Sequence, residues 1–191
     1  IAVLDSIISQ NNLNYISPLE IGTQTWFNGR LRFFVAGNYG NSSGVNDTIY
    51  TLPENFGNLT GLATLYLEWH RISELPESFN NLTDLMSLYI NNNILSSIGD
   101  SIGNLTNLYF LDLGYNELPE VPASICNLEN LTYLWLFNNN LEIHFSNIIL
   151  QKRKDSYYKF YIPILKYYGN NIGYITKEVC LSWIKGFIID T

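Results

Sequence analysis

The residues that could carry acid–base or metal chemistry are few in this chain of 191 residues, and they are scattered. The two histidines, His70 and His144, lie far apart and have no catalytic motif around them. Asp112 and Glu117 are close in sequence, but no base accompanies them, and such a pair is typical of a solvated face. The chain lacks the sequence patterns of serine hydrolases, phosphate-binding loops, zinc proteases and dinucleotide-binding folds. We therefore predict a protein that is not an enzyme and that holds no metal or cofactor.

The two cysteines, Cys126 and Cys180, form neither a metal-binding spacing nor a CxxC pair. In an oxidising compartment they would form one disulfide, and otherwise they would be two free buried thiols. The sequence leaves both alternatives open.

Charge is distributed unevenly along the chain, whose net charge is −7. Residues 1–150 contain 14 acidic and 3 basic residues, whereas residues 151–191 contain 3 acidic and 7 basic residues. Because phosphate backbones are bound by basic surfaces, the acidic body argues against nucleic acid as the main partner. No run of about 18 uncharged apolar residues occurs, so we predict no membrane span.

The elements that must position the remaining side chains follow from an internal repeat of 23 residues. Leu59, Leu82, Leu105 and Leu128 each lie in an Asn-Leu-Thr or Asn-Leu-Glu segment. Each is followed by the frame LxxLxLxxNxLxxLP, which loses its final Leu-Pro in the last copy. The alternating leucines predict a short strand whose leucines face inward, and the asparagine can satisfy the backbone of the turn that follows. One copy cannot bury its leucines alone, so the copies must stack.

This frame resembles the leucine-rich-repeat family, specifically the 23-residue kind common in bacterial proteins, over residues 31–145. The resemblance implies an α/β fold, a right-handed solenoid in the shape of a horseshoe with a short parallel sheet. We predict five parallel strands centred near residues 33–35, 65–67, 88–90, 111–113 and 134–136.

The first of these five copies is degenerate. Phe33 and Val35 are matched to the two strand leucines, and about nine extra residues are inserted at 39–48, which we predict to be a surface loop. In the second copy His70 stands in the asparagine position, and we interpret it as a substitute that makes the same kind of hydrogen bonds.

Both ends of such a solenoid need covers. We predict that residues 1–30 form an N-terminal cap, made of a helix and of a strand that turns at Asn28-Gly29 to pair antiparallel with residues 33–35. This segment resembles caps in bacterial surface proteins, which implies an extracellular or cell-surface location.

Residues 146–191 are predicted to be a C-terminal cap or tail. The apolar spacing of Ile175, Val179, Trp183 and Phe187 predicts an amphipathic helix that would pack on the last repeat. Alternatively, the basic run at 152–154 makes this segment a contact for an acidic partner.

The family rule places the residues between and after the strand leucines on the inner, concave face. Because exposed, ordered aromatic side chains suit binding, this aromatic-rich face is the predicted ligand site. We expect a recognition scaffold for a protein or a peptide; the alternatives are a carbohydrate-binding or adhesin module, and a structural subunit of a surface assembly. The predicted ligand-binding residues are Phe34, Tyr66, Glu68, Trp69, Tyr89, Asn91, Phe110, Asp112, Tyr115, Tyr133, Trp135 and Phe137.

Overall fold

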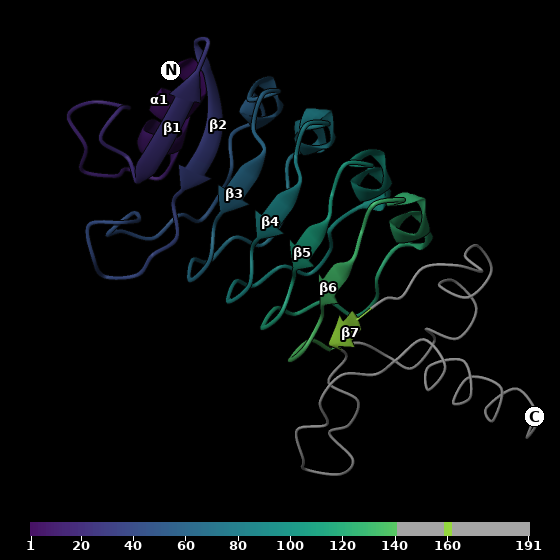
Figure 1. Ribbon diagram of the computed structural model, residues 1–191. Helices are drawn as coiled ribbons and strands as arrows, with labels where there is room; N and C mark the ends of the chain where they lie inside the picture. Colours follow the sequence, from purple (N-terminus) through teal and green to yellow (C-terminus); the bar gives the residue numbers. More distant parts are fainter. Residues whose placement is uncertain (141–158, 162–191) are drawn as a thin grey trace, which may run out of the picture.

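The computed structural model describes residues 1–140 and 159–161 of the chain. A single sheet of seven strands runs through this part in sequence order (Figure 1). Strand β1 pairs antiparallel with β2, and every later neighbour pairs in parallel. The strands are β1 (Thr23–Phe27), β2 (Arg30–Val35), β3 (Thr64–Tyr66), β4 (Ser87–Tyr89), β5 (Phe110–Asp112), β6 (Tyr133–Trp135) and β7 (Lys159–Tyr161).

The predicted parallel arrangement is confirmed, and the strands of the four regular copies begin one residue earlier than predicted. Residues 23 apart are direct partners, so Leu65, Leu88, Leu111 and Leu134 lie side by side across the sheet. All four leucines are buried. The 23-residue period therefore sets the register, because a shift of one residue would turn each leucine out of the core.

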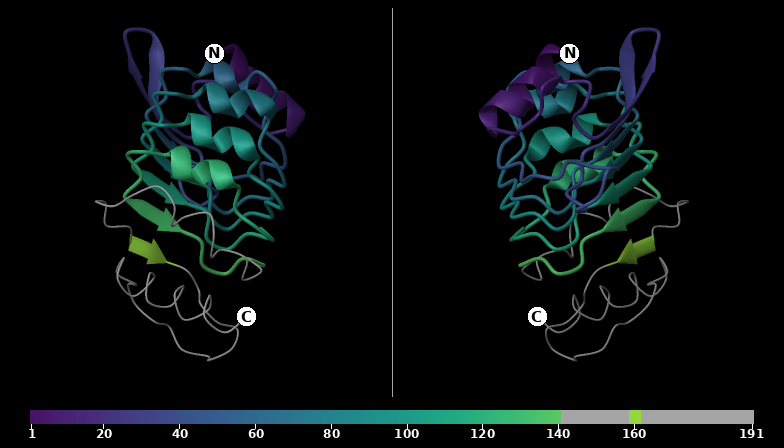
Figure 2. Two further views of the ribbon diagram at one scale, coloured as in Figure 1. Left: turned by 90° about the vertical axis from the view of Figure 1, so that its right-hand side faces the viewer. Right: turned by 90° about the vertical axis from the view of Figure 1, so that its left-hand side faces the viewer.

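Short 3-10 helices form the other side of each repeat (Figure 2). Three of the four described helices begin directly after a Pro or Gly. Each helix carries an apolar side chain into the core, as Phe79 and Ile102 do. Phe56 and Phe79 of two consecutive helices stack with their ring centroids 5.6 Å apart. The helices are η1 (Phe56–Asn58), η2 (Glu77–Asn81), η3 (Asp100–Asn104) and η4 (Ala123–Asn127).

A ladder of asparagines holds the turns that follow the strands. The Oδ1 atom of Asn93 accepts the N–H of Ile72 at 3.0 Å, and its Nδ2 donates to the carbonyl of Leu67 at 2.8 Å. Asn116 and Asn139 repeat both bonds one and two copies later. Each asparagine thus satisfies backbone groups of the preceding repeat that the bend would otherwise leave unpaired.

The N-terminal segment contains the predicted helix and hairpin. Helix α1 (Ala2–Gln10) buries Val3, Leu4 and Ile7 against the first copy. The β1–β2 turn places Asn28 and Gly29 at φ of 49° and 73°, the left-handed conformation that a two-residue hairpin turn requires.

The predicted register of the first copy is wrong by one residue. Phe34, not Phe33, is the partner of Leu65 and lies in the core with Ala36. Phe33 and Val35 project from the opposite face and are half-buried. The insertion is not wholly a surface loop either, since Val45 is buried and its N–H donates to the carbonyl of Gly37 at 3.0 Å.

The expected C-terminal cap, the helix near residues 174–188 and Cys180 lie outside the described residues. Within that segment only Lys159–Tyr161 is described, as a strand parallel to β6. The division into a cap, repeats and a tail remains a prediction. Within residues 1–140 and 159–161, no helix is long and apolar enough to cross a membrane.

Candidate binding face

The concave face consists of the side chains that β2 to β6 and the turns after them project away from the leucine core. Its middle column holds the strand residues paired across the sheet, Tyr66, Tyr89, Asp112 and Trp135. Neighbouring strands are about 4.8 Å apart, so aromatic side chains in one column meet at stacking distance. Because residues 23 apart are paired across the sheet, side chains at the same position of successive repeats form one continuous surface.

Aromatic rings form a continuous row along this face. The rings of Tyr66 and Tyr89 stack with centroids 4.3 Å apart and an interplanar angle of 5°. Tyr89 stacks on Phe110 at 4.6 Å, and Phe110 meets Trp135 edge-on at 4.8 Å. At one end of the row the ring of Phe33 lies 5.7 Å from that of Tyr66. At the other end the ring of Phe137 lies 6.2 Å from that of Trp135 and 5.0 Å from that of Tyr115. We define the aromatic row as Phe33, Tyr66, Tyr89, Phe110, Trp135, Phe137 and Tyr115.

The aromatic row leaves the middle column at β5, where that column holds Asp112. The Asp112 side chain is 4% exposed, and its Oδ1 accepts the N–H of Gly114 at 2.9 Å. Phe110, two residues earlier, carries the row past this position. A carboxylate therefore lies at the centre of an otherwise aromatic surface.

A second carboxylate, that of Glu68, lies in the next column and is 8% exposed. Its Oε2 accepts a hydrogen bond from the hydroxyl of Tyr39, which belongs to the insertion at 39–48. Gly37 permits this contact, because a Cβ on Gly37 would lie 2.3 Å from the Tyr39 ring. The insertion thus reaches back and forms one border of the concave face.

Burial disfavours the charged forms of these groups. It raises the pKa of Glu68, although the hydrogen bond from Tyr39 opposes the shift. Burial raises the pKa of Asp112 to about 6, with the Gly114 N–H opposing and the charge of Glu68 adding to the increase. Burial likewise raises the pKa of Tyr89 to about 12 and that of Tyr39 further still. Burial therefore makes the charged form of each carboxyl group costly in free energy.

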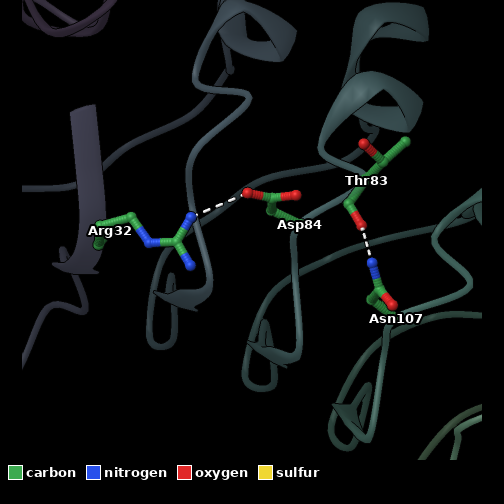
Figure 3. Close-up of polar contacts among 4 residues, drawn as sticks. All are labelled: Arg32, Thr83, Asp84 and Asn107. Atoms are coloured by element: carbon green, nitrogen blue, oxygen red, sulfur yellow. Dashed lines mark hydrogen bonds and ion pairs between the residues drawn. The ribbon is translucent and has the colours of Figure 1, made fainter. Parts of the chain in front are cut away.

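The arginine at the border of this face is already paired. Arg32 Nη1 lies 2.8 Å from Asp84 Oδ2, an ion pair between two partly exposed side chains (Figure 3). Asp84 stands where later copies have Asn107 and Asn130, which donate to the carbonyls of Thr83 and Thr106. An aspartate cannot donate in this way and pairs with Arg32 instead. In the described part of the chain, Glu68 and Asp112 have no basic partner.

Two aromatic residues of the face lie in turns with left-handed backbone. Trp69 and Tyr115 have φ of 64° and 52°, and their side chains are 58% and 49% exposed. The equivalent positions of the other copies hold Asn92 and Asn138, at φ of 55° and 53°. Asparagine tolerates this conformation, whereas a bulky aromatic residue in it is an outlier. Folding alone therefore favours asparagine at positions where this chain exposes aromatic rings.

The predicted site residues divide into four groups. Trp69 and Tyr115 are exposed, and Glu68 and Asp112 are nearly buried. Phe34 is wrongly assigned, since it is 0% exposed and belongs to the core. The remaining predicted residues are half-buried on the concave face: Tyr66, Tyr89, Asn91, Phe110, Tyr133, Trp135 and Phe137.

Two aromatic residues of the concave face were not predicted, Phe33 and Tyr39. Phe33 is the neighbour of the residue that was wrongly assigned, and the Phe-Phe pair was the signal that could have found it. The contact of Tyr39 with Glu68 depends on how the insertion folds, for which the repeat pattern carries no signal. Within the described residues, no group of three or more His, Cys, Asp or Glu side chains could hold a metal ion.

Comparison with known proteins agrees with this description. Residues 83–141 match the family model described as Leucine rich repeat. No curated protein sequence matches the chain. Similar solved structures include the leucine-rich-repeat protein LIC12759 of Leptospira interrogans, at 35% identity and a TM-score of 0.49, covering 50% of this chain and 24% of that one.

Two similar structures come from Arabidopsis thaliana. The ectodomain of the receptor kinase SOBIR1 has a TM-score of 0.57 at 21% identity, covering 74% of this chain and 87% of that one. The ectodomain of the membrane receptor kinase GASSHO1/SCHENGEN3 was solved in complex with Casparian strip integrity factor 2. It has a TM-score of 0.51 at 28% identity, and the match covers 58% of this chain and 13% of that one.

This chain spans about a quarter of the length of the Leptospira protein. The 23-residue register, the asparagine ladder and the match over residues 83–141 lead to one assignment. Residues 83–141 belong to the leucine-rich-repeat family, and the described part of the chain has the solenoid fold of that family.

Proposed function

We propose that this chain is a non-catalytic recognition scaffold that binds a peptide, or an extended segment of a protein, on its concave face. The observation that carries the proposal is the exposure of Trp69 and Tyr115 in left-handed turns. Two other copies have asparagine there, so stability does not account for the aromatic rings. Aromatic residues are typical of binding hot spots because they bury a large area with few rotatable bonds.

The dimensions of the face favour an extended ligand. Five strands about 4.8 Å apart span about 19 Å, and five residues along a strand span roughly 17 Å. This gives a flat area on the order of 320 Å², well below the roughly 800 Å² per partner of a standard protein interface. A peptide that crosses the strands can use the face together with Trp69 and Tyr115.

The related GASSHO1/SCHENGEN3 ectodomain was solved in complex with Casparian strip integrity factor 2, which supports recognition of a protein partner. A carbohydrate is a weaker candidate, because sugar-binding aromatic rings offer a free face. Here Tyr66 and Tyr89 cover one another at 4.3 Å. We further propose an extracellular or cell-surface location, as in the receptor ectodomains to which the fold is similar.

The test is selection of a displayed library of random 12-residue peptides on the full chain, followed by measurement of the selected peptides on variants. Tyr89→Ala and Trp135→Ala are expected to weaken binding at least tenfold, with circular dichroism confirming that both fold. Tyr50→Ala is the matched control, because Tyr50 is an exposed aromatic residue outside the concave face. Selected peptides that bind both concave-face variants as well as the parent would exclude this face as the site.

A further inference from the structure

The centre of the concave face holds two carboxyl groups, and neither has a basic partner in the described part of the chain. Glu68 and Asp112 are its acidic groups, both more than nine-tenths buried. Burial raises the pKa of Asp112, and the charge of Glu68 adds to that increase. The ion pair of the face lies at its border, between Arg32 and Asp84.

The fold does not require either charge. The hydrogen bond from Gly114 N–H to Asp112 Oδ1 would form equally with the amide oxygen of an asparagine. Other copies place Tyr66, Tyr89 and Trp135 in the column of Asp112. The Tyr39 hydroxyl could likewise donate to a glutamine at position 68. Buried carboxylates that a neutral isostere could replace destabilise the free protein, and a cation brought by a ligand would offset that cost.

The surroundings of the two carboxylates select the kind of cation. The aromatic row passes beside Asp112 through Tyr89 and Phe110, whose rings stack at 4.6 Å. A guanidinium group packs against aromatic rings, and its planar set of N–H groups can donate hydrogen bonds to two carboxylates at once. A metal ion fits less well, because the described residues include no third acidic, His or Cys ligand near the pair.

We propose that the partner presents an arginine side chain whose guanidinium binds Glu68 and Asp112 at the centre of the concave face. This inference rests on the proposed function, because the arginine belongs to the bound peptide. One carboxylate oxygen of Glu68 already accepts a hydrogen bond from Tyr39, and its remaining lone pairs can accept from the guanidinium. Asp112 can accept from the guanidinium with the oxygen that does not accept from Gly114. The aromatic row provides the apolar surface for the arginine stem and the residues beside it.

The test uses the peptide selection described above, at pH 7.5, and adds two variants, Asp112→Asn and Glu68→Gln. Peptides selected on the parent are expected to share an arginine at one position. Synthetic peptides with glutamine in place of that arginine are expected to bind the parent at least tenfold more weakly. When binding to Asp112→Asn is measured, the same replacement should weaken it threefold or less, because one of the two carboxylates that bind the guanidinium is gone.

The design separates this inference from the function on which it rests. Peptides that need Tyr89 but share no arginine would overturn the inference and leave the proposed function standing. An arginine-to-glutamine cost equal in the parent and in both variants would also overturn it. A selection that yields no Tyr89-dependent peptide would overturn the proposed function and the inference together. Thermal melting of both variants at or above the parent temperature excludes unfolding as the cause of lost binding.

Discussion

The Nε2 atom of His70 lies 2.6 Å from the carbonyl oxygen of Ala36, the contact that an asparagine Nδ2 makes in the three following copies. The other ring nitrogen, Nδ1, accepts the N–H of Ile49 at 3.1 Å. The neutral ring with its proton on Nε2 therefore reproduces both bonds of the asparagine ladder. This confirms the interpretation of His70 as a ladder substitute.

Because a protonated His70 could not accept from Ile49, the chain should lose stability in acid. Burial lowers the pKa of His70, partly offset by its bond to Ala36 and by Asp47. The free energy of unfolding is thus expected to be highest above the unfolded-state pKa of about 6.5 and to fall as the pH drops towards the lower folded-state value.

His70→Asn, which keeps both hydrogen bonds available, should remove this part of the acid sensitivity. Urea denaturation of the parent and the variant at pH 7.5 and pH 5.0 measures the effect. Identical losses of stability in the two proteins would contradict the assignment of a neutral, buried ring.

The strand leucines should be costly to truncate. Leu88 and Leu111 are fully buried between neighbouring repeats, so replacing either with alanine leaves a cavity and is expected to destabilise the fold by roughly 2–5 kcal/mol. Met86→Ala is the control, because Met86 is exposed beside the same strand and should change stability by less than about 0.5 kcal/mol. A loss below about 1 kcal/mol in both leucine variants would contradict the inward assignment.

Asp112→Asn is expected to stabilise the free protein at pH 7.5 by up to about 3 kcal/mol. Burial raises the folded-state pKa of Asp112 to about 6 from the ordinary 3.8, so the parent loses stability as the pH rises through that interval. The asparagine has no such loss, and the advantage of the variant should shrink between pH 6 and pH 4. Glu68, Tyr39 and Tyr89 face the same region and remain in both proteins. A variant less stable than the parent at pH 7.5 would show that the charge itself supports the fold.

Trp69→Asn and Tyr115→Asn should each stabilise the fold by roughly 0.5–1 kcal/mol, because asparagine tolerates the left-handed backbone better. The same variants should weaken binding of concave-face peptides. The reverse change, Asn92→Tyr, is the matched control and should destabilise by a similar amount. Thermal denaturation provides the stability comparison, and unchanged melting in all three variants would remove the argument from backbone strain.

The sequence predicted four of the five repeats because their leucines can occupy only one face of the sheet. It failed at residues 33–36, where Phe-Phe-Val-Ala allows two alternations, Phe33 with Val35 or Phe34 with Ala36. The observed register buries Phe34 and leaves Phe33 to extend the aromatic row. Without a regular leucine at either position, the pattern could not decide between the two.

The candidate site was predictable as a surface but not in its details. The repeat predicted which residues share a column of the face. It could not predict the hydrogen bond from Tyr39 to Glu68, because Tyr39 belongs to an insertion outside the repeat frame. The left-handed turns could have been inferred, since Asn92 and Asn138 mark the positions that Trp69 and Tyr115 occupy in other copies.

The four tryptophans of the chain provide the most direct test of the central claim, that the concave face binds the partner. Trp69 and Trp135 lie on that face, whereas Trp26 lies in the β1–β2 hairpin, where its indole N–H donates to Gln24. The measurement is ¹⁹F NMR of the chain labelled with 5-fluorotryptophan, assigned by single Trp→Phe variants and titrated with a selected peptide. The account predicts that the Trp69 and Trp135 signals shift in proportion to occupancy while the Trp26 signal stays in place. Saturation of binding with the Trp69 and Trp135 signals unmoved would contradict it.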